Sequence, residues 1–504
     1  MPSRQMVEKR STHSEYDFPH LHVVMQVCFP NVFTPELAMR LAACQDIDMT
    51  RKDSQQNRRD FVTRTATGFA AASLVPYFTG RRSLAGEPTS KNDRINFALV
   101  GCGNMGRYNA TEARKHGDVV AVCDVDSQRR ESAANEFQAE KSYEHYRELL
   151  DRKDIDVIIC ATPDHWHSRI LVDSILAGKD VYCEKPLTLT IEEGQLIRKA
   201  AGTAGQVINV GTQQRSRKEL FLTAIALVQD GRLGDLKRIQ CAIGDAPSSA
   251  VIPVTPVPES LNWDVWQGQT ASTEYRADSK NDARFGRTHH TFRWWYEYSG
   301  GTLTDWGAHH VDIGVWAMGH RAHQGPVTIS GTATLPIEMK DGYPVRNDMY
   351  NTPTAFHVTI KFPDGLELVI RSDTDQGVLL DGTKGRLFVN RGRISGAAVE
   401  ALQDAPLPED ALRNAYKGIE PHDDPSSHVN HWRQFVDCLR ERREPISDIV
   451  SHIKALNFVH AANISLRLNR ELVYDPEAEI FVGDDMANAF VARERRKGYE
   501  IDVG

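Results

Sequence analysis

The stretch RINFALVGCGNMGRYNA, residues 94–110, decides the fold. Its apolar start, Ile95–Val100, is typical of a buried strand, and the residues after the glycines are compatible with a helix to about Lys115. A G-x-G-x-x-G turn between a strand and a helix lets a pyrophosphate approach the backbone N–H groups at the helix start. We therefore expect a dinucleotide to bind at Gly101, Gly103, Asn104, Met105 and Gly106.

A second strand is expected over Val119–Cys123, and it ends at Asp124, 124 − 106 = 18 positions after the last glycine of the turn. A carboxylate at about 20 residues accepts hydrogen bonds from the adenosine ribose and repels a 2′-phosphate. The pattern therefore favours NAD over NADP. Arg129 and Arg130 follow closely and leave NADP as the alternative.

The alternation of strands and helices continues to about residue 214 and predicts an α/β domain with a doubly wound parallel sheet, the Rossmann fold. We expect strands over 157–160, 180–183 and 207–210, and helices over about 128–136, 168–177 and 191–203. The motif VYCEKPLT, residues 181–188, then lies at the carboxyl end of a sheet strand, where open α/β sheets bind ligands. The alternative is a surface turn that carries a salt bridge.

The pattern changes after about Arg215. Ala355–Phe362 alternates apolar and polar residues, a Pro-Asp-Gly turn follows, and a further strand is expected over Leu366–Arg371. This predicts a carboxyl-terminal α+β domain with a largely antiparallel open sheet, covered on one face. We expect residues 246–300 to form loops over the site, and helices over 428–439 and 449–468.

Three segments resemble, in order and spacing, the signatures of the Gfo/Idh/MocA (glucose-fructose oxidoreductase / inositol dehydrogenase / MocA) family. They are Gly101–Gly106, Ala161–His167 and Glu184–Pro186, and the resemblance covers roughly residues 94–470. It implies that Lys185 reaches both the cofactor and a substrate hydroxyl, and that the other cofactor-binding residues are Thr162, Pro163, His167, Glu184 and Gln213. Asp164 stands where the family commonly has Asn, which places a carboxylate near the cofactor.

The stretch SGGTLTDWGAHHVDI, residues 299–313, carries a second candidate constellation. Thr304 is expected to cap a helix on which Asp305 and His309, at i and i+4, share one face, with His310 about 100° away. A carboxylate beside an imidazole can orient it and stabilise its protonated form, as a general base requires. The alternative is a capping Asp and a buried core His. Because the pair matches the family's Asp-x-x-x-His dyad, we expect Lys185, Asp305 and His309 to be catalytic.

A sugar or polyol is the expected substrate. Aromatic residues near the dyad can stack on a sugar ring, although each alone is more typical of core packing. They are Trp263, Trp266, Trp294, Trp295, Tyr296 and Trp306, joined by Arg215 and His290. The substrate-binding residues expected are Lys185, Arg215, Trp306 and His309.

The composition of the chain argues against nucleic-acid binding, a disulfide framework and a metal site. The net charge of −8 offers no basic face for nucleic acid. The eight cysteines include no CxxC and suggest neither a disulfide framework nor a thiolate zinc site. The histidines His422, His428 and His431 fall on or beside the amphipathic helix expected over 428–439, so we expect no metal site.

The amino-terminal region resembles a twin-arginine export signal. Arg58-Arg59 precedes a weakly apolar run over 66–75 that is too short to span a membrane, and Ser83-Leu84-Ala85 suits cleavage. The alternative is a basic turn before a short core helix, in which case the protein is cytoplasmic. We expect export to the periplasm or beyond, with translation starting at Met49. The alternative is that residues 1–48 are an extra amino-terminal segment of unknown purpose.

The expected domains are therefore an extension over 1–48 that is not translated, a signal peptide over 49–85, an NAD(P)-binding Rossmann domain over 86–214, a substrate and oligomerisation domain over 215–473, and a charged tail over 474–504 that wraps the surface or a neighbouring subunit. By resemblance the chain forms a homo-dimer or homo-tetramer through the open sheet.

The expected activity is hydride transfer between a secondary hydroxyl of a sugar or polyol and NAD(P). Outside the cytosol no pool of free NAD exists, so an exported protein must hold its dinucleotide tightly. Two other hypotheses stay open: a glycoside hydrolase in which bound NAD drives a redox-neutral cycle of oxidation, elimination and addition, and a non-catalytic sugar or nucleotide sensor on the same fold.

Overall fold

The computed structural model describes residues 94–202, 204–278 and 286–503. The expected extension over 1–48 and the twin-arginine signal over 49–85 lie outside the described residues.

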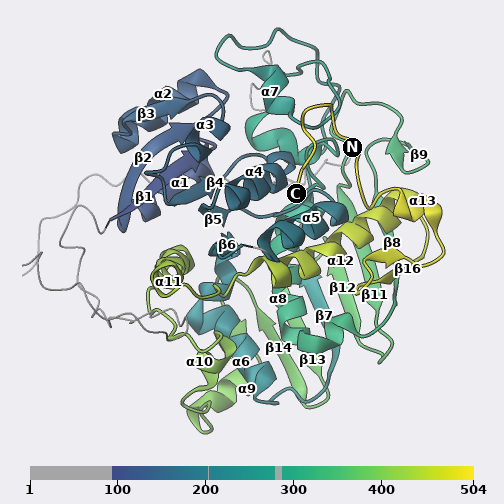
Figure 1. Cartoon of the computed structure of the whole chain (residues 1–504). Coiled ribbons are helices and arrows are strands. Elements are labelled where there is room, and N and C mark those ends of the chain that lie inside the picture. The colour runs from purple at the N-terminus through teal and green to yellow at the C-terminus, as the bar shows by residue number, and fades with distance from the viewer. Residues whose placement is uncertain (1–93, 203, 279–285, 504) are drawn as a thin grey trace, which may run out of the picture. The chain divides into compact units, whose positions relative to one another are not determined.

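The first domain is a Rossmann fold, as predicted (Figure 1). Six strands, all pairing in parallel, lie in the order β3-β2-β1-β4-β5-β6. The strands are β1 (Ile95–Val100), β2 (Gly117–Cys123), β3 (Lys141–Tyr143), β4 (Val157–Cys160), β5 (Asp180–Cys183) and β6 (Ile208–Val210). The helices are α1 (Asn104–Ala113), α2 (Ser127–Phe137), α3 (Arg147–Leu150), α4 (Asp164–Leu176) and α5 (Ile191–Gly202). The order reverses between β1 and β4, the point where such sheets bind dinucleotides.

Helix α4 begins at Asp164, four positions before the expected start at Ser168. Pro163 precedes it with φ −61° and ψ 154°, which sets the backbone for a helix entry. The polar residues after Pro163 have no apolar periodicity, so the pattern placed the start too late. Residues 164–167 therefore form the first turn of α4, which begins at the carboxyl edge of the sheet, where a dinucleotide is expected to bind.

The second domain contains a nine-stranded sheet in the order β15-β14-β13-β7-β12-β11-β8-β16-β17. Its neighbours pair antiparallel except β7 with β12, which confirms the largely antiparallel prediction. The strands are β7 (Leu236–Ala242), β8 (Val327–Thr334), β11 (Ala355–Lys361), β12 (Glu367–Arg371), β13 (Gly377–Gly382), β14 (Gly385–Val389), β15 (Ile394–Ser395), β16 (Leu472–Asp475) and β17 (Ile480–Phe481). The last two strands belong to the segment that the sequence assigns to a wrapping tail.

Two long helices cover one face of this sheet, and their ends position the site (Figure 1). They are α8 (Thr302–Met318) and α12 (Ile449–Leu468), and α12 also packs on α5 of the first domain. Helix α8 begins two residues before the expected cap, because Gly301, with φ +77°, is its N-cap. Thr304 is therefore not the cap. Its hydroxyl oxygen accepts a hydrogen bond from the N–H of Gly300 at 3.1 Å.

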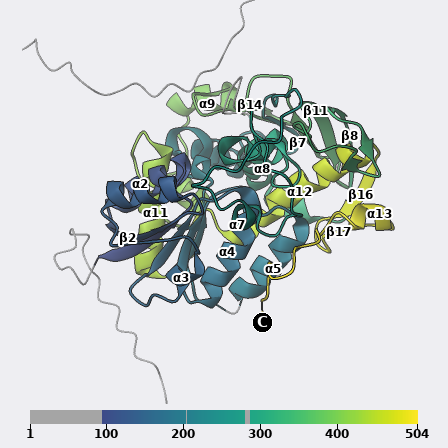
Figure 2. The same ribbon diagram turned by 90° about the horizontal axis from the view of Figure 1, so that it is seen from above.

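The smaller helices complete the domain: α6 (Thr223–Gln229), α7 (Trp263–Gln267), α9 (Ala397–Glu400), α10 (Ala411–Ala415), α11 (Ser427–Glu441) and α13 (Asp485–Asn488). A short hairpin is formed by β9 (Met339–Lys340) and β10 (Tyr343–Pro344). The segment expected as loops over the site crosses the carboxyl ends of the first sheet, where α7 lies beside α4 (Figure 2). Backbone hydrogen bonds pin it there, from Ser127 to Ser260 at 2.8 Å and from Asn262 to Val125 at 3.0 Å.

Candidate active site

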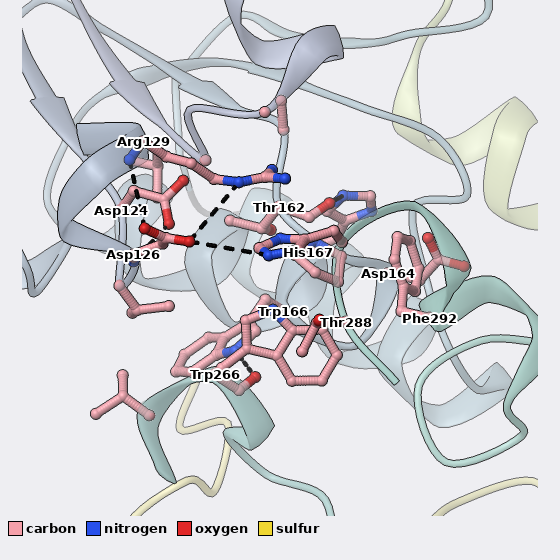
Figure 3. A pocket seen from close by; sticks show the side chains of 18 of the residues that line it. Asp124, Asp126, Arg129, Thr162, Asp164, Trp166, His167, Trp266, Thr288 and Phe292 are labelled. Carbon is pink, nitrogen blue, oxygen red and sulfur yellow. Dashed lines mark hydrogen bonds and ion pairs between the residues drawn. The ribbon is translucent and has the colours of Figure 1, made fainter. Parts of the chain in front are cut away.

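One cavity of about 990 Å³ lies over the carboxyl ends of β1, β2, β4 and β5. The glycine-rich turn and Asp124 line one part of it, and Lys185 and Asp305 line another. Figure 3 shows Asp124, Asp126 and Arg129 on one side, Thr162, His167 and Asp164 on the other, and Trp166 and Trp266 below. Gly286 and residues 288–293 of the second domain line the cavity as well. A dinucleotide and a small second ligand can therefore share one cavity.

The glycine-rich turn fits a pyrophosphate. A Cβ on Gly101, where φ is +91°, would lie 2.6 Å from the carbonyl oxygen of Ala161, and one on Gly106 would lie 1.9 Å from the oxygen of Gly101. Gly103 caps α1 without any side-chain hydrogen bond, so the N–H groups of the first turn stay available for an anion. Gly103, Asn104 and Met105 line the cavity, whereas Gly106 packs behind the turn.

Asp124 follows β2 at the place that a ribose-binding carboxylate requires. It accepts hydrogen bonds from the N–H of Cys102 at 2.7 Å and of Asp126 at 2.9 Å, which fix it against the glycine-rich turn. Burial raises its pKa, and these hydrogen bonds offset part of that effect. Arg130 donates to the carbonyl oxygen of Asp124 at 2.8 Å, and Arg129 lies 3.9 Å from the Asp126 carboxylate. Arg129 and Arg130, the two arginines that could have bound the 2′-phosphate of NADP, thus both contact acidic or carbonyl oxygens of the protein.

The loops after β4 and β5 are braced together by His167. Its ring nitrogens lie 2.7 Å from the carbonyl oxygen of Pro186 and 2.8 Å from that of Thr162. Glu184 accepts hydrogen bonds from Asn109 at 2.9 Å and from Gln213 at 3.3 Å, and burial raises its pKa. Thr162, Pro163, His167 and Glu184 line the cavity, whereas Gln213 lies behind Glu184 and does not.

Lys185 is held by Asp305, across the boundary between the two domains. The Nζ atom donates to Asp305 Oδ1 at 2.6 Å and to the Asp305 carbonyl oxygen at 3.1 Å. Arg293 Nε lies 3.5 Å from the other carboxylate oxygen. Burial alone would raise the pKa of Asp305, but the charges of Lys185 and Arg293 outweigh it and hold the pKa well below its usual range. Asp305 is thus a permanent anion that positions the lysine.

His309 does not form the expected dyad. No hydrogen bond joins it to Asp305 in the described part of the chain, and its Nδ1 has no partner there. It is buried behind the cavity wall, and burial together with the charges of Lys185 and Arg391 lowers its pKa well below the usual value. The expected stabilisation of a protonated imidazole is therefore wrong, because the carboxylate meant to provide it faces Lys185. These effects keep the imidazole neutral and disfavour its protonation.

Asp164 joins the two domains at the cavity wall. Its Oδ2 accepts a hydrogen bond from the Ser299 hydroxyl at 2.6 Å, just before the glycine turn that starts α8. Burial raises the pKa of Asp164 to about 6. The carboxyl is thus partly protonated in mildly acidic solution, and it ties the Thr162-Pro163 loop to the helix that carries Asp305.

Two models of one oxidoreductase family match the chain. The model of the NAD-binding Rossmann fold matches residues 95–212, and that of the C-terminal alpha/beta domain matches residues 248–501. The chain belongs to the Gfo/Idh/MocA family of oxidoreductases. Its first domain is accordingly an NAD-binding domain, which agrees with the fit of the glycine-rich turn and Asp124.

Similar proteins of this family include both redox and hydrolytic members. Glycosyl hydrolase family 109 protein 2 of Shewanella sp. (strain ANA-3) is 31% identical over 206 residues, which are 36% of this chain and 44% of that protein. Inositol 2-dehydrogenase of Salmonella paratyphi B is 25% identical over 175 residues, 34% of this chain and 50% of that protein. The match thus spans half or less of these relatives. A levoglucosan dehydrogenase solved with NADH and L-sorbose shares the fold, with a TM-score of 0.55, 17% identity and coverage of 76% and 99% of the two chains.

Arg215 of this Gfo/Idh/MocA protein is not available to a substrate. Its guanidinium pairs with Asp312 through hydrogen bonds of 2.6 and 2.7 Å and donates to the Ile446 carbonyl and the Ser451 hydroxyl, both at 2.9 Å. The side chain is 3% exposed and does not line the cavity. The predicted substrate contact is therefore wrong. The residue serves the core instead, because every donor nitrogen is engaged there.

The expected aromatic sugar platform is mostly core packing. Trp306 packs beside the core and under the guanidinium of Arg391, 4.6 Å from the ring centroid, and does not line the cavity. Trp266 does line it and stacks on Trp263 with centroids 5.0 Å apart. His290 lines it too, and burial lowers its pKa to about 4. The remaining aromatics, Trp294, Trp295 and Tyr296, stay off the cavity wall.

The other histidines and the cysteines form no further site within the described ranges. His422 lies 2.8 Å from Asp437, His428 packs on Tyr108, and His431 bonds to Ser216 and Val210. The described cysteines are buried and free, and the described residues hold no cluster arranged to bind a metal. Among the same residues no helix is long and apolar enough to cross a membrane.

Replacing Asp124 with Ser tests the ribose site. Loss of a charged acceptor for the ribose hydroxyls is expected to weaken NAD binding by roughly tenfold to a hundredfold, from about 1.5–3 kcal/mol per charged hydrogen bond. NADP binding should improve relative to NAD, because the repulsion of a 2′-phosphate is removed. Titration with both dinucleotides measures the ratio. An unchanged ratio would contradict the assignment of Asp124 to the ribose.

Replacing Asp164 with Asn tests the interdomain carboxyl. Because the pKa of Asp164 rises from 3.8 to about 6 on folding, ionisation destabilises the folded state as the pH rises through this window. Asn keeps the acceptor for Ser299 and cannot ionise. The free energy of unfolding of the variant, relative to the wild type, should therefore increase from pH 4 to pH 7 by about 2 kcal/mol. Denaturant unfolding at several pH values checks this, and a difference independent of pH would contradict it.

Proposed function

We propose that this chain is an NAD-dependent oxidoreductase that transfers a hydride between a secondary hydroxyl of a sugar or polyol and the nicotinamide. The observation that carries the proposal is that Lys185, held 2.6 Å from Asp305, lines the same cavity as the glycine-rich turn and Asp124. The cofactor-binding residues proposed are those of the turn together with Asp124, Thr162, Pro163 and Glu184. His167 and Gln213 are proposed to support them from behind.

Lys185 is the proposed catalytic residue, and Asp305 its positioning residue. When bound, NAD supplies the hydride acceptor. Nζ of Lys185 is charged in its ion pair with Asp305, so it would donate a hydrogen bond to the reacting hydroxyl oxygen and favour loss of the hydroxyl proton, while the anionic Asp305 keeps the ammonium turned toward the cavity. Arg293 holds the far side of Asp305, so that the carboxylate cannot rotate away without losing a second ion pair.

His309 is proposed as a transient acceptor of the hydroxyl proton, because its lowered pKa disfavours a stable imidazolium. It is neutral because of its burial and neighbouring cations, its Nδ1 has no partner within the described ranges, and it lies one helical turn beyond Asp305. This role differs from that of a base oriented by Asp305. In a His309→Asn variant it predicts a loss of kcat that is smaller than that of Lys185→Met.

The experiment is a substrate screen under single-turnover conditions. The protein is mixed with NAD and, one at a time, with inositol, glucose, levoglucosan and N-acetylated hexoses, and the absorbance of reduced nicotinamide is followed. Formation of reduced dinucleotide with one of these supports a dehydrogenase. A protein that binds NAD but reduces it with none of them would favour the sensor hypothesis.

A second candidate function is a redox-neutral glycoside hydrolase, and the 31% identity to a glycosyl hydrolase family 109 protein favours it. Oxidation of one sugar carbon acidifies the C–H bond next to it, the glycosidic oxygen then leaves by elimination, water adds, and the hydride returns to the first carbon. The net reaction is hydrolysis of the glycosidic bond, with no net change in the oxidation state of the sugar or of NAD. Release of nitrophenol from aryl glycosides, with solvent deuterium at the acidified carbon and no net reduced NAD, would identify this cycle.

We propose that the protein is exported and that it forms a homo-oligomer. We propose export by the twin-arginine route on the strength of Arg58-Arg59 and the apolar run after them. We also propose a homo-dimer or homo-tetramer through the face of the second sheet opposite α8 and α12, where His357, Thr359 and their neighbours are only half-buried. Fractionation of cells and light scattering of the purified protein test these points.

A further inference from the structure

The cavity has an apolar chamber on the side of β3. Asp124 ends β2, and Glu144–Arg147 follow β3, one strand further from the point where the strand order reverses. Because Asp124 faces the adenosine ribose, the space beyond it on this side is where the adenine of a bound dinucleotide lies. We call the part of the cavity lined by Tyr146, Trp166, Ile170, Leu261, Val265 and Tyr499 the chamber; Glu144, His145 and Arg147, which follow β3, line the same cavity.

Trp166 is the centre of this chamber, and aromatic rings stand on two sides of it. Its ring centroid is 5.9 Å from that of Tyr146 and 5.7 Å from that of Tyr499, and both contacts are edge-on. Its indole N–H donates to the carbonyl oxygen of Trp266 at 3.0 Å. Gly268 presses on the same indole, since a Cβ there would lie 2.7 Å from it. The indole is therefore fixed from several sides. Of its neighbours, Tyr499 comes from the carboxyl-terminal segment.

Tyr499 belongs to the carboxyl-terminal segment, residues 491–503, which leaves the second sheet and crosses to α7 and α4 (Figure 1). Several contacts dock this segment, among them the following. Arg495 pairs with Glu192 at the start of α5 at 2.7 Å. Arg496 pairs with Asp264 of α7 at 2.5 Å and donates to the carbonyl oxygen of Gly268 at 2.6 Å. Ile501, 8% exposed, packs into the core of the first domain.

The docked segment also orients Tyr499. The guanidinium of Arg496 lies over the Tyr499 ring, 4.8 Å from its centroid, and the N–H of Tyr499 donates to the Arg496 carbonyl oxygen at 3.0 Å. The ring is half-buried, and its hydroxyl makes no hydrogen bond to any described residue that would hold it elsewhere. The arginine thus fixes both the backbone and the ring at the wall of the chamber.

We propose that Tyr499 is a wall of the adenine subsite and that residues 491–503 act as a clasp, which must detach from α4 and α7 before NAD can leave. The inference rests on NAD occupying this cavity, as proposed above. A planar purine fits beside Tyr499 and Trp166, because stacking on aromatic side chains is a strong contact that needs no particular base edge. A clasp of this kind would retain a dinucleotide without a covalent link.

The test uses the full-length protein and its Tyr499→Ala variant, with Tyr499→Phe and the exposed neighbour Lys497→Ala as controls. Bound NADH is chased with excess NAD, and its dissociation is followed by nicotinamide fluorescence. Tyr499→Ala should increase the dissociation rate constant between about fivefold and a hundredfold. Arg496→Gln, which loosens the clasp but keeps the ring, should also increase it, and both controls should stay within about twofold of the wild type.

Fragments of the cofactor separate an adenine contact from a general loss of structure. Tyr499→Ala should weaken AMP as a competitor of NADH by a factor similar to its effect on NADH, and should leave nicotinamide mononucleotide unchanged. Equal losses for both fragments, or no change in NADH dissociation while the wild type binds NADH normally, would overturn the clasp but leave the proposed function standing. A wild-type protein that binds no NADH would overturn both.

Discussion

Replacing Lys185 with Met is expected to lower kcat by about 10²- to 10⁴-fold, the range that a positioned proton-transfer group contributes. Met has a similar length and no charge, so it removes the donor to Asp305 at 2.6 Å and the amine that faces the cavity. The affinity for NAD should change little, because the glycine-rich turn and Asp124 are untouched. Single-turnover reduction of NAD measures the first effect, and equilibrium titration measures the second.

The matched control is Lys153→Met, an exposed lysine outside the cavity, which should leave both quantities unchanged. Asp305→Asn provides a graded comparison, because it keeps the shape of the partner but removes its charge. A Lys185→Met variant that keeps turnover within about tenfold of the wild type would show that another group, with His309 as the first candidate, carries the proton.

Replacing Arg215 with Met is expected to destabilise the protein by about 3–5 kcal/mol, since it leaves Asp312 buried and without its cation. Both side chains of the pair are nearly inaccessible, 3% and 1% exposed, and His452 Nδ1, 3.2 Å from Asp312, is a much weaker replacement. Denaturant unfolding measures the loss. In the fraction that folds, KM for the sugar should be unchanged, because Arg215 lies off the cavity.

A double variant, Arg215→Met with Asp312→Leu, distinguishes this account from simple loss of packing. When both charges are absent, no unpaired ion is buried, and most of the lost stability should return. The opposite pattern, full stability of Arg215→Met together with a raised KM, would restore the substrate contact that the sequence predicted.

The first domain could be predicted from sequence almost completely, because its signals are local. Five of the six strands are mainly apolar runs bounded by glycines or polar residues, and β4 and β5 begin and end where the pattern places them. The exception is β3, a short polar strand over Lys141–Tyr143 that the pattern did not predict. The glycine-rich turn and Asp124 follow from spacing along one βαβ unit. These features can be predicted without knowing which segments distant in the sequence come into contact.

The candidate site was less predictable, because its ion pairs join distant segments. Asp305 has a histidine at i+4 on its own helix, yet its partners are Lys185, 120 positions away, and Arg293. The sequence offered no signal for Arg293, which lies in a short 3-10 helix, His289–Trp294, whose position only the fold decides. Tyr499 was missed for the same reason. Asp164 could be singled out from the family's usual Asn, but its partner Ser299 could not.

The most direct test of the central claim is the content and redox state of dinucleotide in the purified protein. The protein is denatured before and after incubation with the sugar panel, and the released dinucleotide is identified by mass and absorbance. The account predicts close to one NAD per chain, retained through purification, with a reduced fraction that changes when a substrate sugar is added. A protein that releases no dinucleotide and binds no added NAD or NADP would contradict it.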